Sequence, residues 1–156
     1  MATSAVFKRD KPQDPKIERL DRDMAGWGKA GMKMVISTPA EVDGLVRAIP
    51  KGKLASTDTL RDVLAKRHKA DVACPLTTGI FVNISARAAA EEEELGAKRI
   101  APWWRVIKSD GKLNEKSPGG VAEHKRRLAA EGFKFVAAGK KNWRVADWEA
   151  RQAKLV

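Results

Sequence analysis

The chain has 156 residues, with 31 Lys or Arg against 20 Asp or Glu, so its formal net charge is +11. This length and 43% hydrophobic residues are typical of one globular domain and argue against a disordered chain. No run approaches the ~18 apolar residues of a membrane span, and the single cysteine excludes an internal disulfide. We therefore expect a cytoplasmic protein with no membrane partner. Its excess of cations suits an anionic partner, above all nucleic acid.

Residues 1–37 contain two prolines and three glycines and predict a partly irregular N-terminal arm. Within the arm, Ile17 and Leu20 could share one face of a short helix between Pro15 and Met24. A capping box at residues 38–41, with proline at the first helical position, predicts a helix that ends at about Ile49.

Ser56 or Thr57 is the expected N-cap of a second helix over residues 58–69, which forms a helical hairpin with the first. A third helix should follow Pro75, run from residue 77 to about residue 94 and stop at Gly96.

Residues 103–107 are rich in strand formers, and residues 109–111 form a turn signal, so we expect a strand that enters a hairpin or wing. Gly119 and Gly120 should open a fourth helix that ends at about Glu131, before a glycine.

The alternation after residue 133 predicts a C-terminal β-hairpin, and Asp147 could cap a short last helix. We expect an α+β fold that is mainly helical, with a winged helix-turn-helix-like domain, a short β-hairpin or wing and a C-terminal β-hairpin extension. Its expected parts are the arm (1–37), a main domain (38–133), and a hairpin with a short helix packed on that domain (134–156).

Three segments of the main domain together resemble the DNA-binding domain of the alkylguanine-DNA alkyltransferase family. They are IPKGKL at residues 49–54, PWWRVIKSDG at residues 102–111 and GGVAEHKRRLAAEG at residues 119–132. Each segment alone is a weak signal, and their shared order and spacing carry the resemblance. It covers residues 38–133, so residues 1–37 and 134–156 lie outside it.

The resemblance implies an enzyme that flips an alkylated guanine into a pocket and transfers the alkyl group to the cysteine of a Pro-Cys-His-Arg motif. The matching residues here are Pro102, Trp103, Trp104 and Arg105. Because an indole offers no thiolate, we expect no alkyl transfer and no enzyme activity. Glu131 matches the carboxylate that orients the family's histidine, and we expect it to have lost the group it orients.

Tryptophan at the cysteine position is typical of alkyltransferase-like proteins, the branch that binds alkylated guanine in DNA without repairing it. The resemblance therefore implies a non-catalytic DNA-binding protein in which Trp103 stacks on the flipped base. In the alternative interpretation both indoles pack in the core. Alternation along a strand would place Trp103 and Trp104 on opposite sides, so that at most one faces the pocket. Ser117 matches the serine loop of the family that contacts the flipped base.

Two DNA-handling residues of the family are replaced. Its tyrosine after a threonine aligns with the pair Ser56 and Thr57, and the chain contains no tyrosine. Its arginine that fills the hole in the base stack aligns with Leu76, ahead of Thr77, Thr78 and Gly79. Leu76 could part base steps as an apolar wedge, although we favour a core position at the helix end.

The predicted DNA-binding residues come from the aligned segments and the basic face of the fourth helix. They are Ser56, Thr57, Leu76, Thr77, Thr78, Gly79, Trp103, Trp104, Arg105, Ser117, Gly119, Gly120, Lys125 and Arg126. The expected partners are double-stranded DNA, including DNA with alkylated guanine, and repair proteins. We expect no cofactor and no metal, because two histidines and one cysteine give no metal-ligand spacing.

Two alternatives stay open. A regulatory or interaction module could reuse the fold to bind undamaged DNA, RNA or a protein through residues 125–127 and the basic tail at residues 140–144. A thiol enzyme would use Cys74 with His68, although a lone cysteine before proline is more often a small buried residue. We place the other histidine, His124, on the polar face of the fourth helix, where it is solvated or faces a phosphate.

Overall fold

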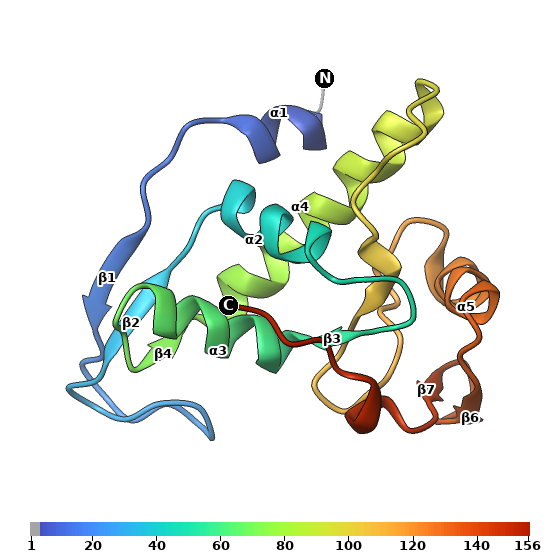
Figure 1. Ribbon diagram of the computed structural model, residues 1–156. Helices are drawn as coiled ribbons and strands as arrows, with labels where there is room; N and C mark the ends of the chain where they lie inside the picture. The colour runs from blue at the N-terminus through green and yellow to red at the C-terminus, as the bar shows by residue number, and fades with distance from the viewer. Residues whose placement is uncertain (1–3) are drawn as a thin grey trace.

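The structure, a computed structural model, describes residues 4–156 (Figure 1). Helices and short strands alternate along the described chain. In order they are α1 (Ala5–Asp10), β1 (Lys16–Arg19), β2 (Lys33–Ile36), α2 (Pro39–Arg47), β3 (Ala55–Ser56), α3 (Thr57–Arg67), β4 (Val72–Ala73), α4 (Pro75–Glu94), the 3-10 helix η1 (Trp103–Arg105), β5 (Val106–Ile107), α5 (Gly120–Ala130), β6 (Phe135–Ala137), β7 (Trp143–Val145) and the 3-10 helix η2 (Trp148–Arg151). The α+β fold class predicted from the sequence is confirmed.

The N-terminal segment is more regular than expected. β1 pairs antiparallel with β2, and β2 pairs parallel with β4, which gives a three-stranded sheet in the order β1-β2-β4. The prediction of a helix between Pro15 and Met24 is wrong, because Lys16–Arg19 is a strand whose residues are all exposed. Pairing with β2, which buries Met34 and Val35, overrides the weak helical spacing of Ile17 and Leu20.

The helices α2 and α3 begin at the expected caps. The Thr38 hydroxyl accepts a hydrogen bond from the Glu41 amide (3.2 Å), and the Ser56 hydroxyl accepts one from the Thr59 amide (3.2 Å). Both caps satisfy amides that have no partner within the helix. Both predicted N-caps are therefore confirmed, but the predicted helical hairpin is not, because α2 packs against α4 and α1. The elements α3, β4 and α4 follow one another as a helix-turn-helix.

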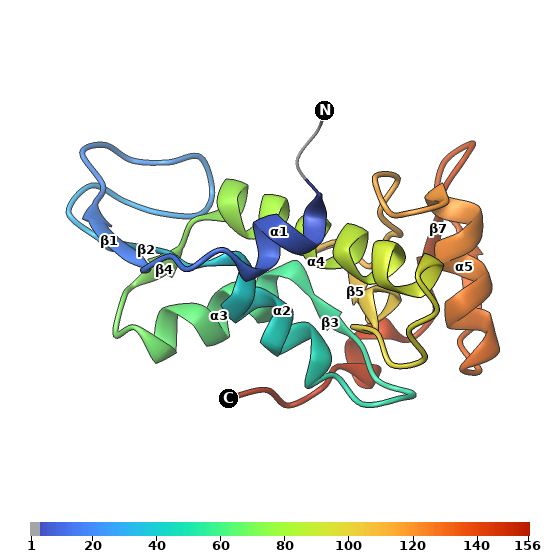
Figure 2. The same cartoon turned by 90° about the horizontal axis from the view of Figure 1, so that it is seen from above.

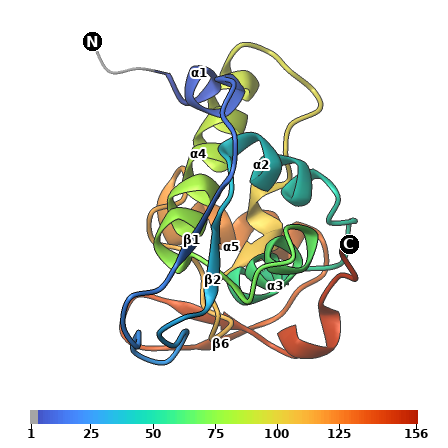
Figure 3. The same ribbon diagram turned by 90° about the vertical axis from the view of Figure 1, so that its left-hand side faces the viewer.

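The longest helix, α4, crosses the molecule and lies beneath α1 in Figure 3. Pro75 occupies its first turn, and at its C-terminal end the Gly96 amide bonds to the Glu93 carbonyl (3.0 Å), as the predicted glycine stop requires. Its buried side contributes Val82, Ala86 and Ala89 to a core shared with α2 and α3.

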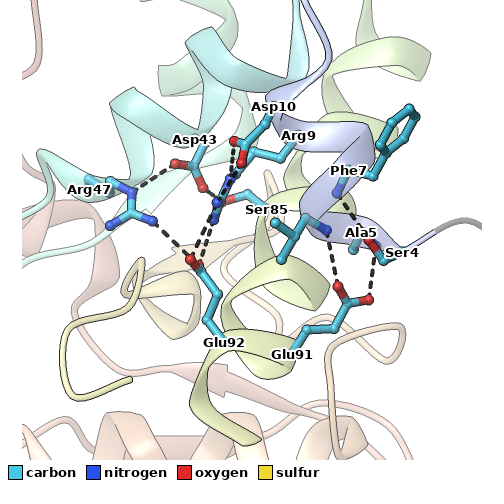
Figure 4. A network of polar contacts seen from close by, with 11 residues as sticks. Ser4, Ala5, Phe7, Arg9, Asp10, Asp43, Arg47, Ser85, Glu91 and Glu92 are labelled. Carbon is cyan, nitrogen blue, oxygen red and sulfur yellow. Dashed lines mark hydrogen bonds and ion pairs between the residues drawn. The ribbon is translucent and has the colours of Figure 1, made fainter. Parts of the chain in front are cut away.

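Ion pairs join the second half of α4 to α1 and α2 (Figure 4). The buried Arg9 guanidinium lies 2.6 Å from Glu92, and the Ser85 hydroxyl donates to Asp43 (2.7 Å). The Glu91 carboxylate accepts the first amides of α1, from Ala5 (2.8 Å) and Val6 (3.1 Å), where the positive end of the helix dipole favours an acid. The acidic run at the end of α4 thus holds the N-terminal segment in place.

The strand predicted over residues 103–107 is only partly correct. Residues Trp103–Arg105 form a 3-10 turn, and only Val106–Ile107 extends as β5. β5 pairs parallel with β3 rather than entering a hairpin. The turn lets the large Trp103 side chain enter the core, where it is 4% exposed.

The C-terminal third matches expectation closely. Gly119, with φ of +79°, precedes α5, and Gly132 follows it. β6 and β7 form the predicted antiparallel hairpin, which packs with α5 around a second core that contains Leu113, Leu128 and Val145. The last turn is the 3-10 helix η2, and the Asp147 side chain does not cap it. Within residues 4–156, no helix combines the length and apolar character that a membrane crossing needs.

Candidate nucleic-acid interface

A cleft of about 630 Å³ opens between the start of α3, the first half of α4 and the loop at residues 108–116, called the 108–116 loop below. This volume falls within the ~300–1,000 Å³ of typical ligand pockets. Its lining includes side chains from all three elements, among them Thr57, Arg61, Leu76, Gly79, Ile80, Asn83, Lys108, Asn114 and Lys116. Three of the predicted interface residues, Thr57, Leu76 and Gly79, therefore meet at one place.

The outer face of α4 in this cleft is apolar and exposed. Leu76 is 72% exposed and Ile80 is 47% exposed, and a Cβ at Gly79 would meet no atom within 4 Å. The interpretation of Leu76 as a core residue is therefore wrong. It fails because Val82 and Thr78 take the buried side of the helix, which turns Leu76 outward.

The remaining aligned residues at the starts of the two helices make hydrogen bonds within the protein. Ser56 is buried as the cap of α3, and Thr78 is buried with its hydroxyl bonded to the Cys74 carbonyl (2.7 Å). The Thr77 hydroxyl reaches the same carbonyl at 3.5 Å. Cys74 is the half-buried N-cap of α4, while His68 Nε2 lies 2.8 Å from Glu41. The bond to Glu41 gives His68 a partner other than the thiol.

The cations of the cleft are largely paired with acids inside it. Arg61 lies 3.3 Å from Asp58, and Lys108 lies 2.9 Å from Glu115. The hydrogen bond from Lys108 lowers the pKa of the Glu115 carboxyl. The cleft therefore presents an apolar helix face with polar walls, rather than a purely basic surface.

One wall of the cleft is attached to α4 by side-chain hydrogen bonds. Asn114 Nδ2 donates to Asn83 Oδ1 (2.9 Å), and the Arg87 guanidinium donates to the Lys116 carbonyl (3.1 Å). The sequence interpretation missed Arg61, Asn83 and the 108–116 loop as parts of the site. The turn signal at residues 109–111 could have drawn attention to that loop, because a turn between strand and helix is a common place for binding residues.

Neither of the two indoles lines the cleft. The Trp103 and Trp104 rings meet edge to face, with centroids 5.8 Å apart, an arrangement that aromatic pairs prefer. They do not alternate across a strand, because both lie in the 3-10 turn. The Trp103 Nε1 atom is buried without a hydrogen-bond partner in the described part of the chain. The structure therefore assigns Trp103 to the core, which was the alternative interpretation.

Glu131 is the hub of a hydrogen-bond network that joins α5 to η1. It accepts bonds from Trp104 Nε1 (2.6 Å), from Arg105 Nε (3.0 Å) and from the Gly52 amide (3.0 Å). Burial opposes ionisation of this carboxyl, but the three donors outweigh burial and lower its pKa. The expectation that Glu131 has no group to orient is wrong, because the indole N–H of Trp104 donates a hydrogen bond just as an imidazole N–H would.

His124 is fully buried, so its expected place on the polar face of the helix is wrong. Its Nε2 lies 2.8 Å from the Trp104 carbonyl and its Nδ1 lies 3.2 Å from the Asn114 amide. Because a carbonyl only accepts and an amide only donates, the ring is neutral with its proton on Nε2. Burial lowers its pKa to about 4. His124 thus joins the 3-10 turn η1, which contains both indoles, to the cleft wall at Asn114.

The other predicted residues of the serine loop and α5 have partners within the protein. Ser117 is buried, with its hydroxyl 3.4 Å from His124 Nδ1. Lys125 lies over the Trp143 ring at 3.5 Å, and Arg126 pairs with Glu123 at 2.6 Å. The glycines at residues 119–120 form the turn into α5 and leave no side chain toward the cleft. In the described residues, no group of three or more His, Cys, Asp or Glu side chains gathers as a metal site.

Comparison with known proteins agrees with this architecture. No family model matches the sequence, and no curated protein matches it. Among solved structures, the chain is similar to S. pombe Atl1, an alkyltransferase-like protein, in complex with damaged DNA containing O6-carboxymethylguanine, with a TM-score of 0.52, 19% identity, and coverage of 75% of this chain and 94% of that chain. A structure of S. pombe ATL in complex with DNA gives a TM-score of 0.49 at 20% identity with the same coverage. The similarity to Atl1 shows that this chain has an alkyltransferase-like fold, which contains a helix-turn-helix.

Proposed function

We propose that this protein is a non-catalytic DNA-binding protein that holds alkylated or otherwise modified guanine of duplex DNA in the cleft beside α4. The observation that carries the proposal is the cleft itself, which lies between the two helices of the helix-turn-helix and the 108–116 loop. The fold of a protein crystallised on damaged DNA and the net charge of +11 support the same partner.

The chemistry behind the cleft favours binding over repair. Trp103 and Trp104 occupy the positions that the family resemblance gives to the acceptor cysteine and its histidine. An indole carbon or N–H is no substitute for a thiolate in an alkyl transfer. His124 is neutral and engaged on both ring nitrogens, so it has no free nitrogen for acid-base work.

The lining of the cleft suits a base that carries an extra alkyl group. Leu76 and Ile80 offer an exposed apolar surface, and Asn83 and Asn114 supply amide groups at its edge. Burying one additional CH₂ is worth about 0.8 kcal/mol, which corresponds to about a fourfold gain in affinity. We therefore expect a preference for alkylated over normal guanine that grows with the size of the alkyl group.

The competing interaction-module hypothesis loses part of its proposed surface. Lys125 and Arg126 are engaged with Trp143 and Glu123, so the basic face of α5 is partly neutralised within the fold. Repair proteins as partners and a cytoplasmic location stay predictions.

The test is a titration of the protein with matched duplexes that differ by a single O6-alkylguanine. Gly79→Glu places a carboxylate in the cleft at a position where a Cβ meets no atom within 4 Å, so the variant should fold and weaken binding to both duplexes. Gly44→Glu adds the same charge to the open side of α2 and serves as the control. Equal affinity of the wild type for both duplexes would exclude the preference for modified guanine. Absence of binding to either duplex would overturn the proposed function.

A further inference from the structure

The C-terminal hairpin contains a group of positively charged residues that lie outside the cleft lining. Residues 133–146 include Lys134, Lys140, Lys141 and Arg144 and no acidic residue. Two of these lysines stand at the turn between β6 (Phe135–Ala137) and β7 (Trp143–Val145), after Gly139 with φ of +89°. This hairpin lies outside the segments that resemble the alkyltransferase family.

The hairpin is attached to the wall of the cleft. Asn142 Nδ2 donates to the Leu113 carbonyl (3.0 Å) and to Glu115 Oε1 (2.9 Å). The Leu113 amide donates to the Trp143 carbonyl (3.1 Å), and Arg144 Nε donates to the Asp110 carbonyl (2.9 Å). Several bonds along one edge hold the hairpin and the 108–116 loop together, so the turn keeps its place relative to the cleft.

The tip of the hairpin is on the same side of the molecule as the 108–116 loop and the first half of α4 (Figure 2). In Figure 2 the tip of the hairpin, the 108–116 loop and the loop between β1 and β2 all lie along the upper side, together with the first half of α4. Lys140 and Lys141 are exposed, and within residues 4–156 no ion pair or side-chain hydrogen bond engages either ammonium group. Lys108, by comparison, is paired with Glu115 inside the cleft.

The cleft and the two free ammonium groups would bind different parts of the same duplex. A base in the cleft contacts apolar and amide groups, while the backbone of the same duplex needs cations that are not already paired. Each phosphate that a lysine neutralises releases a condensed counterion. This release strengthens binding and makes the affinity depend on the salt concentration. Compact ammonium groups on a fixed turn suit this contact, because phosphate contacts position a duplex without reading its sequence.

We propose that the β6–β7 turn is a second DNA contact, in which Lys140 and Lys141 bind backbone phosphates of the duplex whose base occupies the cleft. This inference rests on the proposed function, since it assigns the phosphate-binding part of the same interface. The contact extends the interface beyond the three segments whose sequence resembles the alkyltransferases. It is independent of base identity, so it strengthens binding to normal and alkylated duplexes alike.

The test measures the dependence of affinity on salt for the full chain and an undamaged duplex. Lys140→Gln with Lys141→Gln removes two contacts, so the slope of log K against log salt should become shallower by about 1.8, at roughly 0.9 for each phosphate. Lys51→Gln with Lys53→Gln removes the same charge from two exposed lysines in the turn after α2, which lies on the opposite side in Figure 2. This control should keep the wild-type slope. Thermal unfolding by circular dichroism verifies that both variants fold.

The outcomes separate the two proposals. A wild type that binds DNA, with the same slope in the Lys140/Lys141 variant, would overturn the turn contact and leave the cleft proposal standing. Equal reductions of the slope in both double variants would also overturn it, because net charge alone would then explain the effect. A wild type that binds no duplex at any salt concentration would overturn the proposed function and this inference together. Charge reversal to Glu at both positions should weaken binding further than the Gln pair does.

Discussion

The cleft and the layer packed behind it use their polar and apolar groups in opposite ways. Behind the cleft, Glu131 accepts three hydrogen bonds and His124 is engaged on both ring nitrogens. In the cleft, the apolar side chains of Leu76 and Ile80 face solvent. The residues behind the cleft therefore stabilise the fold, whereas the exposed apolar side chains of the cleft are available to the proposed ligand. Changes behind the cleft should therefore lower stability, and changes in the cleft should alter binding.

The largest expected effect comes from the core indole. Trp103→Ala removes a buried aromatic ring and should lower the free energy of unfolding by about 3–5 kcal/mol. Trp103→Phe should cost much less, because a ring remains and the buried Nε1 without a partner is removed. Urea unfolding followed by circular dichroism measures both. If Trp103→Phe kept full stability yet abolished the preference for alkylated guanine, Trp103 would belong to the binding surface instead of the layer behind it.

The second prediction concerns how His124 makes the free energy of unfolding depend on pH. Its pKa is about 4 in the folded protein because of burial, and about 6.5 in an unfolded chain. The unfolded state therefore takes up a proton first as the pH falls. Stability should be full above pH ~6.5, fall by up to ~1.4 kcal/mol per unit toward pH ~4 and level off below that for this group, a total of about 3 kcal/mol.

Urea unfolding at intervals between neutral and mildly acidic pH measures this dependence. His124→Gln removes the titrating ring and should flatten the curve above the range in which the carboxyl groups titrate. Glu131 adds a separate loss only at lower pH, since its depressed pKa makes its contribution disappear as the pH falls through that value. A His124→Gln curve as steep as that of the wild type would show that His124 is not the buried neutral group.

The helices were predictable because their ends are determined by local chemistry. A hydroxyl cap at Thr38 or Ser56 and a glycine at residue 96 or 132 act within one turn of chain, so sequence alone indicates them. β1 was not predictable in the same way. All its residues are exposed, and only its partner strand more than ten residues away fixes its conformation.

The residues of the candidate site fall into the same two groups, those with a local signal in the sequence and those without one. The meeting of Thr57, Leu76 and Gly79 followed from the order of two helices, which the sequence reveals. The burial of His124 had a local signal that the interpretation missed, because Val121, His124 and Leu128 recur at helical spacing on one face. The bond from Trp104 to Glu131 had no such signal, since it joins residues 27 positions apart through tertiary packing.

A third prediction tests the far end of α4. Arg9→Ala removes a guanidinium that is 9% exposed and paired with Glu92, and it should lower the free energy of unfolding by about 2 kcal/mol. The loss is limited because Glu92 is partly solvated and keeps Arg47 at 3.7 Å. Arg22→Ala, which breaks a pair between side chains that are 79% and 87% exposed, is the control and should change stability by less than about 0.5 kcal/mol. Arg9→Ala should leave the affinity for DNA unchanged, because Arg9 is buried beside Glu92 and lies outside the cleft lining.

The smallest expected effect separates the cleft from the rest of the surface most directly. Gly79→Ala and Gly44→Ala each replace a helical glycine whose Cβ meets no atom within 4 Å, so each should raise the free energy of unfolding by up to ~1 kcal/mol. Only the methyl group at residue 79 stands in the cleft. Gly79→Ala should therefore weaken binding of the alkylated duplex while Gly44→Ala leaves it unchanged, as a fluorescence titration of both variants would show. Equal affinity of the two variants would mean that the ligand does not approach α4 at residue 79.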